Sequence, residues 1–214
     1  MYVLGLTGSI AMGKSWAAKC FHHFGVPIHD SDACVHRLLV PGGKATAEIL
    51  SAFPGVEDNR GGVDRLKLSE SVFGHDAELA LLEHILHPMV FESQYRFLAA
   101  QARARKRVVL LDIPLLFETG AQKRVDGVVV ASAPVDLQYA RALRRPGMSL
   151  EKLHAIMDRQ VPDALKCMGA DFVVKTGATK GSSLQQVKKV IDTVGQKPGK
   201  VWGPGWLRTK NFKG

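Results

Sequence analysis

The stretch GSIAMGKS at residues 8–15 fits the pattern G-x-x-x-x-G-K-[ST], and it decides the fold prediction. In this pattern backbone N–H groups wrap phosphate oxygens at the start of a helix, and the glycines let the backbone approach and turn. Lys14 would bridge the β- and γ-phosphates of ATP, and the Ser15 hydroxyl would ligate Mg2+. The residues expected to line the nucleotide site here are Gly8, Ser9, Ile10, Ala11, Met12, Gly13, Lys14, Ser15 and Trp16.

The sequence on both sides of this loop predicts an α/β fold. An apolar run at residues 2–7 precedes the loop, and a helical pattern that follows it meets a stop signal at Gly25. Further apolar strands are predicted at residues 26–28, 108–112, 128–130 and 172–174, with helical stretches between them. Apolar strands that alternate with helices indicate a parallel sheet covered on both faces, so we predict a three-layer P-loop fold.

The remaining segments predict a core with attachments. Residues 33–105 are helical or irregular and contain several turn signals, so we expect a helical insertion. Residues 1–32 and 106–195 would then form the core of the fold. Residues 196–214 are rich in Gly, Pro and Lys and are expected to form a basic tail without fixed structure, although Trp202 and Trp206 could dock on a surface.

Composition sets limits on location and partners. Hydrophobic residues make up 46% of the chain and charged residues 23%, as in globular proteins, and no apolar run reaches the length of a membrane span. We therefore expect a cytoplasmic protein without membrane contact, as a monomer or small homo-oligomer. The net charge of +9 suits either nucleic acid or a substrate with several phosphates, but nucleic acid is not expected because no aromatic and basic motif occurs outside the tail. The three scattered cysteines predict neither a zinc site nor a disulfide framework.

Acidic residues at two predicted strand ends are candidates for chemistry. Asp30 and Asp32 follow the second strand, and the strand ends of an open parallel sheet lie on the same rim as the phosphate loop. Either carboxylate could reach the acceptor hydroxyl or a water on Mg2+, and either could instead cap the next helix. Asp112, at the end of the strand at 108–112, would be a second Mg2+ ligand, or would cap a helix that starts at Pro114.

Several motifs together resemble those of the dephospho-CoA kinase family. They follow the family's order over roughly residues 1–193 and comprise GLTGSIAMGKS (5–15), HDSD (29–32), DRLKLSESVF (64–73), LHP (86–88), LDIPLLFE (111–118) and AD (170–171). The resemblance implies transfer of the ATP γ-phosphate to the ribose 3'-hydroxyl of dephospho-CoA, with Mg2+ required. It also implies that the insertion at residues 33–105 binds the acceptor within a kinase, that Asp32 is the acceptor-side base and that His87 lies in the region that binds the CoA substrate. His87, which precedes a proline, could equally be a helix-end residue satisfied by the backbone. Arg37 and Arg65 are further candidates to hold acceptor phosphates, or are solvated surface arginines or salt-bridge partners.

Resemblance to P-loop kinases also implies a lid at residues 139–165. Arg141 and Arg145 would lie on one helical face by the i, i+4 rule and could reach the triphosphate. Such a lid closes over ATP, excludes water and supplies charge to the transition state. The alternative is a basic solvated face. Arg159 and Gln160 would belong to the same lid, without an assigned role.

Three positions depart from the pattern of the family. Ala11 replaces a usual glycine, which predicts a negative φ at this residue, because alanine is disfavoured in the left-handed region. Trp16 replaces a usual threonine, and Thr176 stands where asparagine is common. These changes would affect ATP affinity more than phosphate chemistry. Alternatives to the implied function are a kinase of another nucleotide or small metabolite, a basic nucleic-acid-binding P-loop protein, and an inactive relative. An N-K-x-D segment is missing, which favours a kinase over a GTPase switch.

Overall fold

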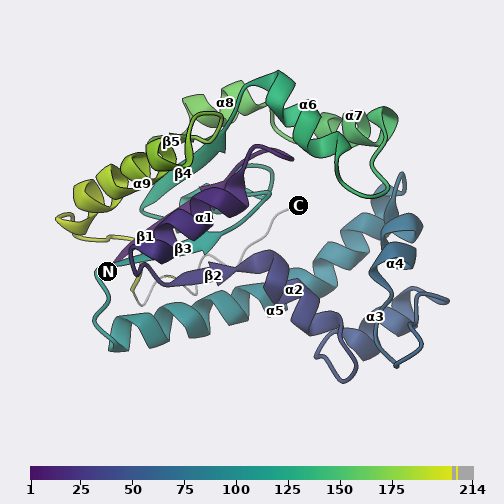
Figure 1. Cartoon of the computed structure of the whole chain (residues 1–214). Helices are drawn as coiled ribbons and strands as arrows, with labels where there is room; N and C mark the ends of the chain where they lie inside the picture. Colours follow the sequence, from purple (N-terminus) through teal and green to yellow (C-terminus); the bar gives the residue numbers. More distant parts are fainter. Residues whose placement is uncertain (204–205, 207–214) are drawn as a thin grey trace. The chain divides into compact units, whose positions relative to one another are not determined.

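The computed structural model describes residues 1–203 and residue 206 (Figure 1). Its strands are β1 (Tyr2–Thr7), β2 (Ile28–Asp30), β3 (Val108–Asp112), β4 (Gly127–Ser132) and β5 (Phe172–Lys175). Its helices are α1 (Lys14–His23), α2 (Ser31–Leu39), α3 (Thr46–Ala52), α4 (Arg65–Val72), α5 (Asp76–Arg103), α6 (Val135–Leu143), α7 (Leu150–Asp158), α8 (Asp163–Met168) and α9 (Lys180–Gly195), with a 3-10 helix at Ala121–Arg124. Within the described chain, no helix combines the length and apolarity that crossing a bilayer requires.

The chain forms two compact units. The first contains residues 1–29 and the chain from residue 98 onward, and the second contains residues 30–97. The strands stand in the order β2-β3-β1-β4-β5, and β1 pairs in parallel with both β3 and β4, as β4 does with β5. The predicted α/β class with a parallel P-loop sheet is therefore confirmed.

Continuous apolar strands build the core of the first unit. All six residues of β1 are buried, and Leu4 and Leu6 pack with Phe21 of α1 and with Val187 of α9. Helix α1 begins directly after the loop, and its apolar side is held against the sheet by this cluster. Each fully buried side chain of this size contributes about 1.5–3 kcal/mol through burial. The core thus fixes where β1 ends and α1 starts, and so places the loop between them.

The second strand starts two residues later than the predicted stretch at 26–28. Gly25 has φ +72°, and the N–H of Val26 donates to the carbonyl of Phe21 at 3.2 Å. This pattern is the C-terminal turn of a helix that is closed by a left-handed glycine. Val26 therefore lies in the turn that follows α1 and not in the strand. The strand β2 consequently runs to Asp30, and α2 starts at the next residue.

The second unit has its own apolar core. Helices α2, α3, α4 and the larger part of α5 bury a separate cluster. Its buried members include Leu38, Ile49, Phe53, Leu68 and Ile85. An isolated antiparallel bridge joins Glu57 to Val63. Helix α5 continues through Pro88.

Part of the segment from residue 196 onward is docked on the first unit. Asp126 accepts hydrogen bonds from the N–H groups of Lys200 and Val201, at 2.6 and 2.9 Å. Trp206 is 1% exposed, and its indole N–H donates to the carbonyl of Arg124. The expectation of a tail without fixed structure does not hold at these positions, and the docking of Trp206 is observed instead. Residues 204–205 and 207–214 of the predicted tail lie outside the described residues.

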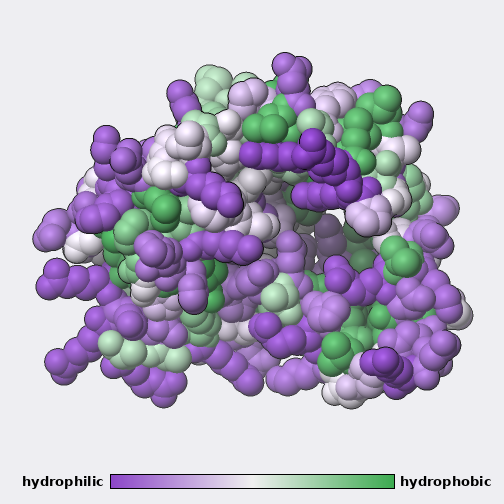
Figure 2. Space-filling model, viewed as in Figure 1, coloured by the Kyte–Doolittle hydropathy of each residue, from purple (hydrophilic) through white to green (hydrophobic). Residues whose placement is uncertain are grey.

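The face drawn in Figure 2 is covered mostly by hydrophilic side chains, with apolar side chains in small separate groups. This agrees with the rule that charged and other strongly polar side chains are mostly exposed in folded proteins.

Candidate active site

The glycine loop between β1 and α1 is shaped by close contacts. A Cβ at Gly8 would stand 2.6 Å from the carbonyl oxygen of Ala131, so this position admits only glycine without a shift of β4. Gly13 has φ +88° directly before α1, and a Cβ there would clash with Thr176. The backbone can therefore turn and approach a ligand at both glycine positions of the motif.

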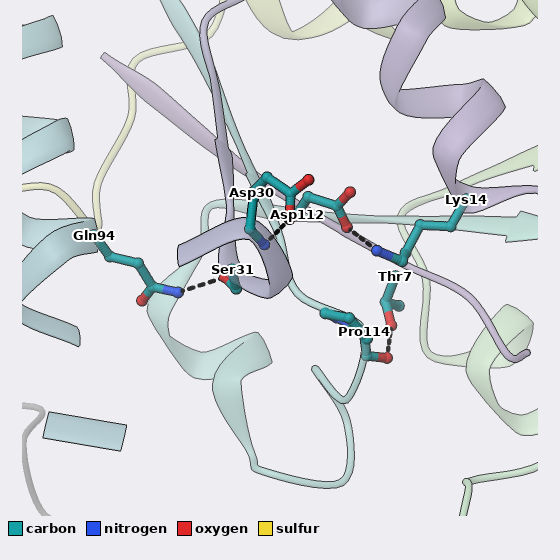
Figure 3. A network of polar contacts seen from close by, with 8 residues as sticks. Thr7, Lys14, Asp30, Ser31, Gln94, Asp112 and Pro114 are labelled. Atoms are coloured by element: carbon teal, nitrogen blue, oxygen red, sulfur yellow. Dashed lines mark hydrogen bonds and ion pairs between the residues drawn. The ribbon is translucent and has the colours of Figure 1, made fainter. Parts of the chain in front are cut away.

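The loop lysine contacts the carboxylate at the end of the neighbouring strand. Lys14 Nζ lies 2.6 Å from Asp112 Oδ1, and the two side chains are 17% and 5% exposed (Figure 3). Because β1 and β3 are adjacent and parallel, their carboxyl ends bring the loop and Asp112 to one edge of the sheet. Residues 114–120 form turns, so no helix starts at Pro114 for Asp112 to cap. The Pro114 carbonyl instead accepts a hydrogen bond from the Thr7 hydroxyl at 2.7 Å.

The donor set at this edge fits Mg2+. Ser15 is exposed in the first turn of α1, and Asp112 supplies a carboxylate at the end of β3. Among the described residues there is no cluster of three or more His, Cys, Asp or Glu side chains that could hold a metal ion. Two hard oxygen donors suit Mg2+, which takes its other ligands from water and phosphate oxygens, and do not suit a zinc cage.

Ala11 adopts a left-handed conformation with φ +61°, so the prediction of a negative φ is wrong. Its side chain is 8% exposed and packs with Ala142 of α6 and Leu153 of α7. This region costs alanine about 1–2 kcal/mol, and strained residues persist where surrounding contacts determine them. The prediction considered only the intrinsic preference of alanine, and tertiary contacts overrule it.

Thr176 joins the loop to the predicted lid arginine. Its hydroxyl donates to the Met12 carbonyl at 2.6 Å, and Arg141 donates to the Thr176 hydroxyl and carbonyl oxygens at 3.2 and 2.8 Å. Thr176, which stands where asparagine is common, therefore holds Arg141 beside the loop. Near the other departure, Lys180 Nζ lies 5.6 Å from the centroid of the Trp16 ring.

Arg145 does not share a helical face with Arg141. Helix α6 ends at Leu143, and Arg145 lies in the following turn. The reason is Pro146, because a proline disfavours helical dihedrals at the preceding residue. The predicted i, i+4 arrangement is wrong, although the signal against it was present in the sequence.

The predicted acceptor residues lie in the second unit. The Asp30 carboxylate accepts from the N–H of Ala33 at 2.9 Å and so caps α2, and Gln94 donates to the Ser31 hydroxyl (Figure 3). Asp32 and Arg37 are exposed on α2. Of the two possible roles for the acidic pair, capping is therefore confirmed for Asp30.

The other two acceptor candidates lie on α4 and α5. Arg65 Nη1 lies 3.1 Å from His36 Nδ1, which brings Arg65 beside α2, the helix that carries Arg37. His87 is half-buried on α5, directly before Pro88. The structure thus gathers Asp32, Arg37 and Arg65 around α2, and it places His87 on a different helix.

Two glutamines bind the loop, of which sequence reasoning missed Gln138 and named Gln160 only as a lid residue without a role. Gln138, 1% exposed on α6, donates from Nε2 to the Ile10 carbonyl at 2.9 Å. Gln160, after α7, accepts from the Ile10 N–H at 2.9 Å. A polar residue in a buried helix position is a weak signal for Gln138. For Gln160 no signal beyond its place beside Arg159 was available.

A buried ion pair at the end of the lid segment was also missed. Lys166 is fully buried on α8, and its Nζ lies 2.9 Å from Glu118 Oε1. The same oxygen accepts from the N–H of Val161 at 2.9 Å. Nearby, burial and the Asp163 carboxylate raise the pKa of the Cys167 thiol. Glu118 thereby ties the segment after α7 to the turn that follows β3.

The fold and this edge of the sheet define a class of protein. A glycine loop joins a central parallel strand to a helix, and its lysine contacts a carboxylate at the end of the adjacent strand. This arrangement is that of the P-loop nucleotide-binding proteins.

Comparisons with known proteins narrow the class to one family. A family model described as Dephospho-CoA kinase matches residues 2–180. A dephospho-CoA kinase of Brucella melitensis is 47% identical over 198 residues, covering 92% of this chain and 98% of the relative. One from Paramagnetospirillum magneticum is 54% identical over 166 residues, covering 78% of each. The chain therefore belongs to the dephospho-CoA kinase family.

Solved structures agree with this assignment. The crystal structure of a Thermus thermophilus protein is similar with a TM-score of 0.77 and 30% identity, covering 90% of this chain and 96% of that one. A dephospho-CoA kinase from Campylobacter jejuni gives a TM-score of 0.67 at 27% identity, covering 91% and 97%. Kinase function on dephospho-CoA follows from the family match and these relatives together, and ATP is the co-substrate of kinases in this family.

Proposed function

We propose that the protein transfers the γ-phosphate of ATP to the ribose 3'-hydroxyl of dephospho-CoA in an Mg2+-dependent reaction. The contact between Lys14 and Asp112 carries the proposal, because it puts a cation and a carboxylate at the mouth of the glycine loop. Phosphoryl transfer needs little covalent chemistry from the protein, and its catalysis is mainly positioning and charge stabilisation. The side chains at this edge are suited to both tasks.

The nucleotide side of the reaction is assigned to the first unit. Backbone N–H groups of residues 8–15 and the start of α1 would hold the phosphates, with Lys14 on the β- and γ-phosphates. Ser15 and Asp112 would hold Mg2+, which when bound neutralises charge on the phosphates. Trp16 and Arg145, which the sequence predicts to lie in the nucleotide site, would also contact ATP.

Arg141 is the lid residue best placed to add positive charge. Its guanidinium already reaches Thr176, which is hydrogen-bonded to the loop at Met12. A fixed guanidinium near the loop stabilises the charge that develops on the transferring group. Residues 139–165 are proposed as the lid that carries it.

The acceptor side is assigned to residues 33–105 and to the end of β2. Asp32 is the better candidate for the base that accepts the proton of the 3'-hydroxyl, because Asp30 uses its carboxylate to cap α2. Arg37 and Arg65 would hold acceptor phosphates, and His87 would contact the CoA part. We also expect the enzyme to act in the cytoplasm as a monomer or small homo-oligomer, without nucleic acid or membrane partners.

The test is ADP production by the purified protein with ATP and Mg2+, with and without dephospho-CoA. The proposal predicts ADP release that depends on dephospho-CoA and stops when EDTA removes the metal. Mass spectrometry of the product should show one added phosphate, and digestion with a 3'-nucleotidase should remove it. ADP release with adenosine, another nucleotide or a small alcohol, but none with dephospho-CoA, would contradict the proposal.

A further inference from the structure

We propose that Gln138 and Gln160 are positioning residues that hold the phosphate loop in its nucleotide-binding conformation, by fixing the two peptide groups on either side of Ile10. The inference rests on the proposed binding of ATP phosphates by residues 8–15. Neither glutamine is assigned to contact the substrates. Their side chains hydrogen-bond to the loop backbone, and the loop backbone binds the phosphates.

The orientation of both amides is determined by their partners. The Ile10 carbonyl can only accept, so Gln138 must present its amide nitrogen, and the Ile10 N–H can only donate, so Gln160 must present its oxygen. The two bonds are 2.9 Å each. They hold different peptide units, since the N–H belongs to the peptide before Ile10 and the carbonyl to the one after it. Together they restrain the backbone dihedrals at Ile10.

The peptide held by Gln138 is the one that leads into Ala11. Rotation of this peptide about the N–Cα bond of Ala11 is the φ of that residue, which is +61°. Alanine disfavours this conformation by about tenfold relative to its ordinary regions. A hydrogen bond on the preceding carbonyl opposes relaxation to negative φ. Gln138 therefore offsets strain at the one loop position where the usual glycine is absent.

Packing alone does not hold the loop on the side of the glutamines. A cavity of about 460 Å³ lies there, and its walls include Ser9, Met12, Gln138 and Gln160. The Ala11 methyl packs against Ala142 and Leu153. The loop tip is thus held by hydrogen bonds beside a cavity and by a small apolar cluster, and both come from the segment that contains α6 and α7.

Glu118 keeps Gln160 within reach of the loop. Its Oε1 accepts from the N–H of Val161, the residue next to Gln160, and lies 2.9 Å from the buried Lys166 Nζ. The backbone at residue 161 is therefore anchored to the turn after β3. The Gln160 side chain projects from this anchored backbone to Ile10.

The test measures the Kd of ATP with Mg2+ by calorimetry for Gln138→Met and Gln160→Met. Each variant keeps the length of the side chain and loses one hydrogen bond, so each should weaken ATP binding about fivefold. Val190→Ala is the matched control, because it opens a cavity in the core beside α9 and lowers stability without touching the loop. It should leave the Kd unchanged at a similar loss in the midpoint of urea unfolding.

A double-mutant cycle separates positioning from simple structural support. In an Ala11→Gly background the left-handed region carries no penalty, so Gln138→Met should lose less than about twofold in ATP affinity. Equal losses in both backgrounds would overturn the role of Gln138 in holding Ala11. An unchanged Kd in both glutamine variants would overturn the proposal as a whole.

Glutamate substitutions give a second, charge-matched comparison. In Gln160→Glu the carboxylate can still accept from the Ile10 N–H, whereas in Gln138→Glu an ionised carboxylate cannot donate to the Ile10 carbonyl. Both substitutions add one negative charge near the loop, so Gln138→Glu should bind ATP at least about fivefold more weakly than Gln160→Glu. The reverse order would contradict the assignment. If the unmodified protein itself does not bind ATP, the proposed function fails; if it binds ATP and all the variants bind equally well, only the positioning role fails.

Discussion

Because Ala11 has a left-handed backbone conformation, replacing it with glycine should change the free energy of unfolding less than the same replacement at Ala142 in the same apolar cluster. Ala11→Gly removes a methyl group whose burial is worth about 0.8 kcal/mol. It also adds freedom to the unfolded chain, which costs about 0.4–1 kcal/mol. These losses are opposed by the release of about 1–2 kcal/mol of conformational strain, because glycine is not disfavoured in the left-handed region. The net change in the free energy of unfolding should therefore lie within about 0.8 kcal/mol of zero, on the sum of these terms.

Ala142→Gly is the matched comparison, because Ala142 packs in the same apolar cluster and is fully buried. It lies on a helix with ordinary dihedrals, so glycine relieves nothing there. The loss is about 0.8 kcal/mol for the methyl group and about 0.5–1 kcal/mol for glycine in a helix, near ~1.5 kcal/mol in total. Urea unfolding followed by circular dichroism measures both variants. If Ala11→Gly destabilises as much as Ala142→Gly, the strain argument is refuted.

Four further predictions concern catalysis, the buried ion pair and a thiol. Lys14→Ala should lower kcat/KM for ATP at least about hundredfold, measured as ADP release, because the loop loses its cation; near-normal turnover would remove the phosphate-loop argument. Asp32→Asn should lower kcat about hundredfold or more with a smaller rise in the KM for dephospho-CoA, as expected for a lost general base; a pure KM effect would assign Asp32 to binding. Glu118→Gln should lower the free energy of unfolding by about 3 kcal/mol, because it leaves the Lys166 charge buried without its partner. Adding Lys166→Met to this variant should restore a large part of that loss. Urea unfolding measures both variants, and a loss that Lys166→Met does not reduce would contradict the argument. The pKa of Cys167 is raised above its ordinary value of 9.0, so alkylation of the folded protein by iodoacetamide should be slow at pH 7 and increase only as the pH passes well above that value; rapid reaction at pH 7 at this residue, mapped by mass spectrometry, would contradict it.

The sequence predicted those parts of the fold that depend on local patterns. Continuous apolar runs at residues 2–7 and 108–112 became adjacent parallel strands, so the loop lysine and Asp112 could be expected at one edge. The start of α1 followed from the glycine loop. The strands themselves and the start of α1 are fixed by the chain near them, and a single sequence contains that information, whereas the pairing of β1 with β3 joins distant segments.

Errors arose where a local boundary signal was weighed too lightly. Pro146 ends α6 before Arg145, and Gly25 keeps Val26 in the turn after α1, which delays β2. Each signal was readable in the sequence. The apolar pattern of the strand and the spacing of the arginines nevertheless set the predicted bounds.

Other features depend on contacts between distant parts of the chain and had no local signal. Gln160 is 150 residues from Ile10, and Gln138 is 128 residues from it. Nothing in the composition of the segments around them indicates this pairing. The φ of Ala11 belongs to the same category, since the lid segment and not the alanine determines it.

The three departures from the family pattern bear on whether the loop can function. An inactive relative was one alternative that the sequence left open, because of the departures at Ala11, Trp16 and Thr176. In the structure, however, the Ala11 methyl fills a buried position, and Thr176 bonds both the loop carbonyl of Met12 and Arg141. These contacts hold the loop in the conformation that a glycine would reach without strain. Lys14 and Asp112 remain in contact at the edge of the sheet. The departures therefore change how the loop is held, and they leave its phosphate-binding groups in place. On this argument the chain should be an active kinase whose ATP affinity depends on Gln138 more strongly than it would with glycine at position 11.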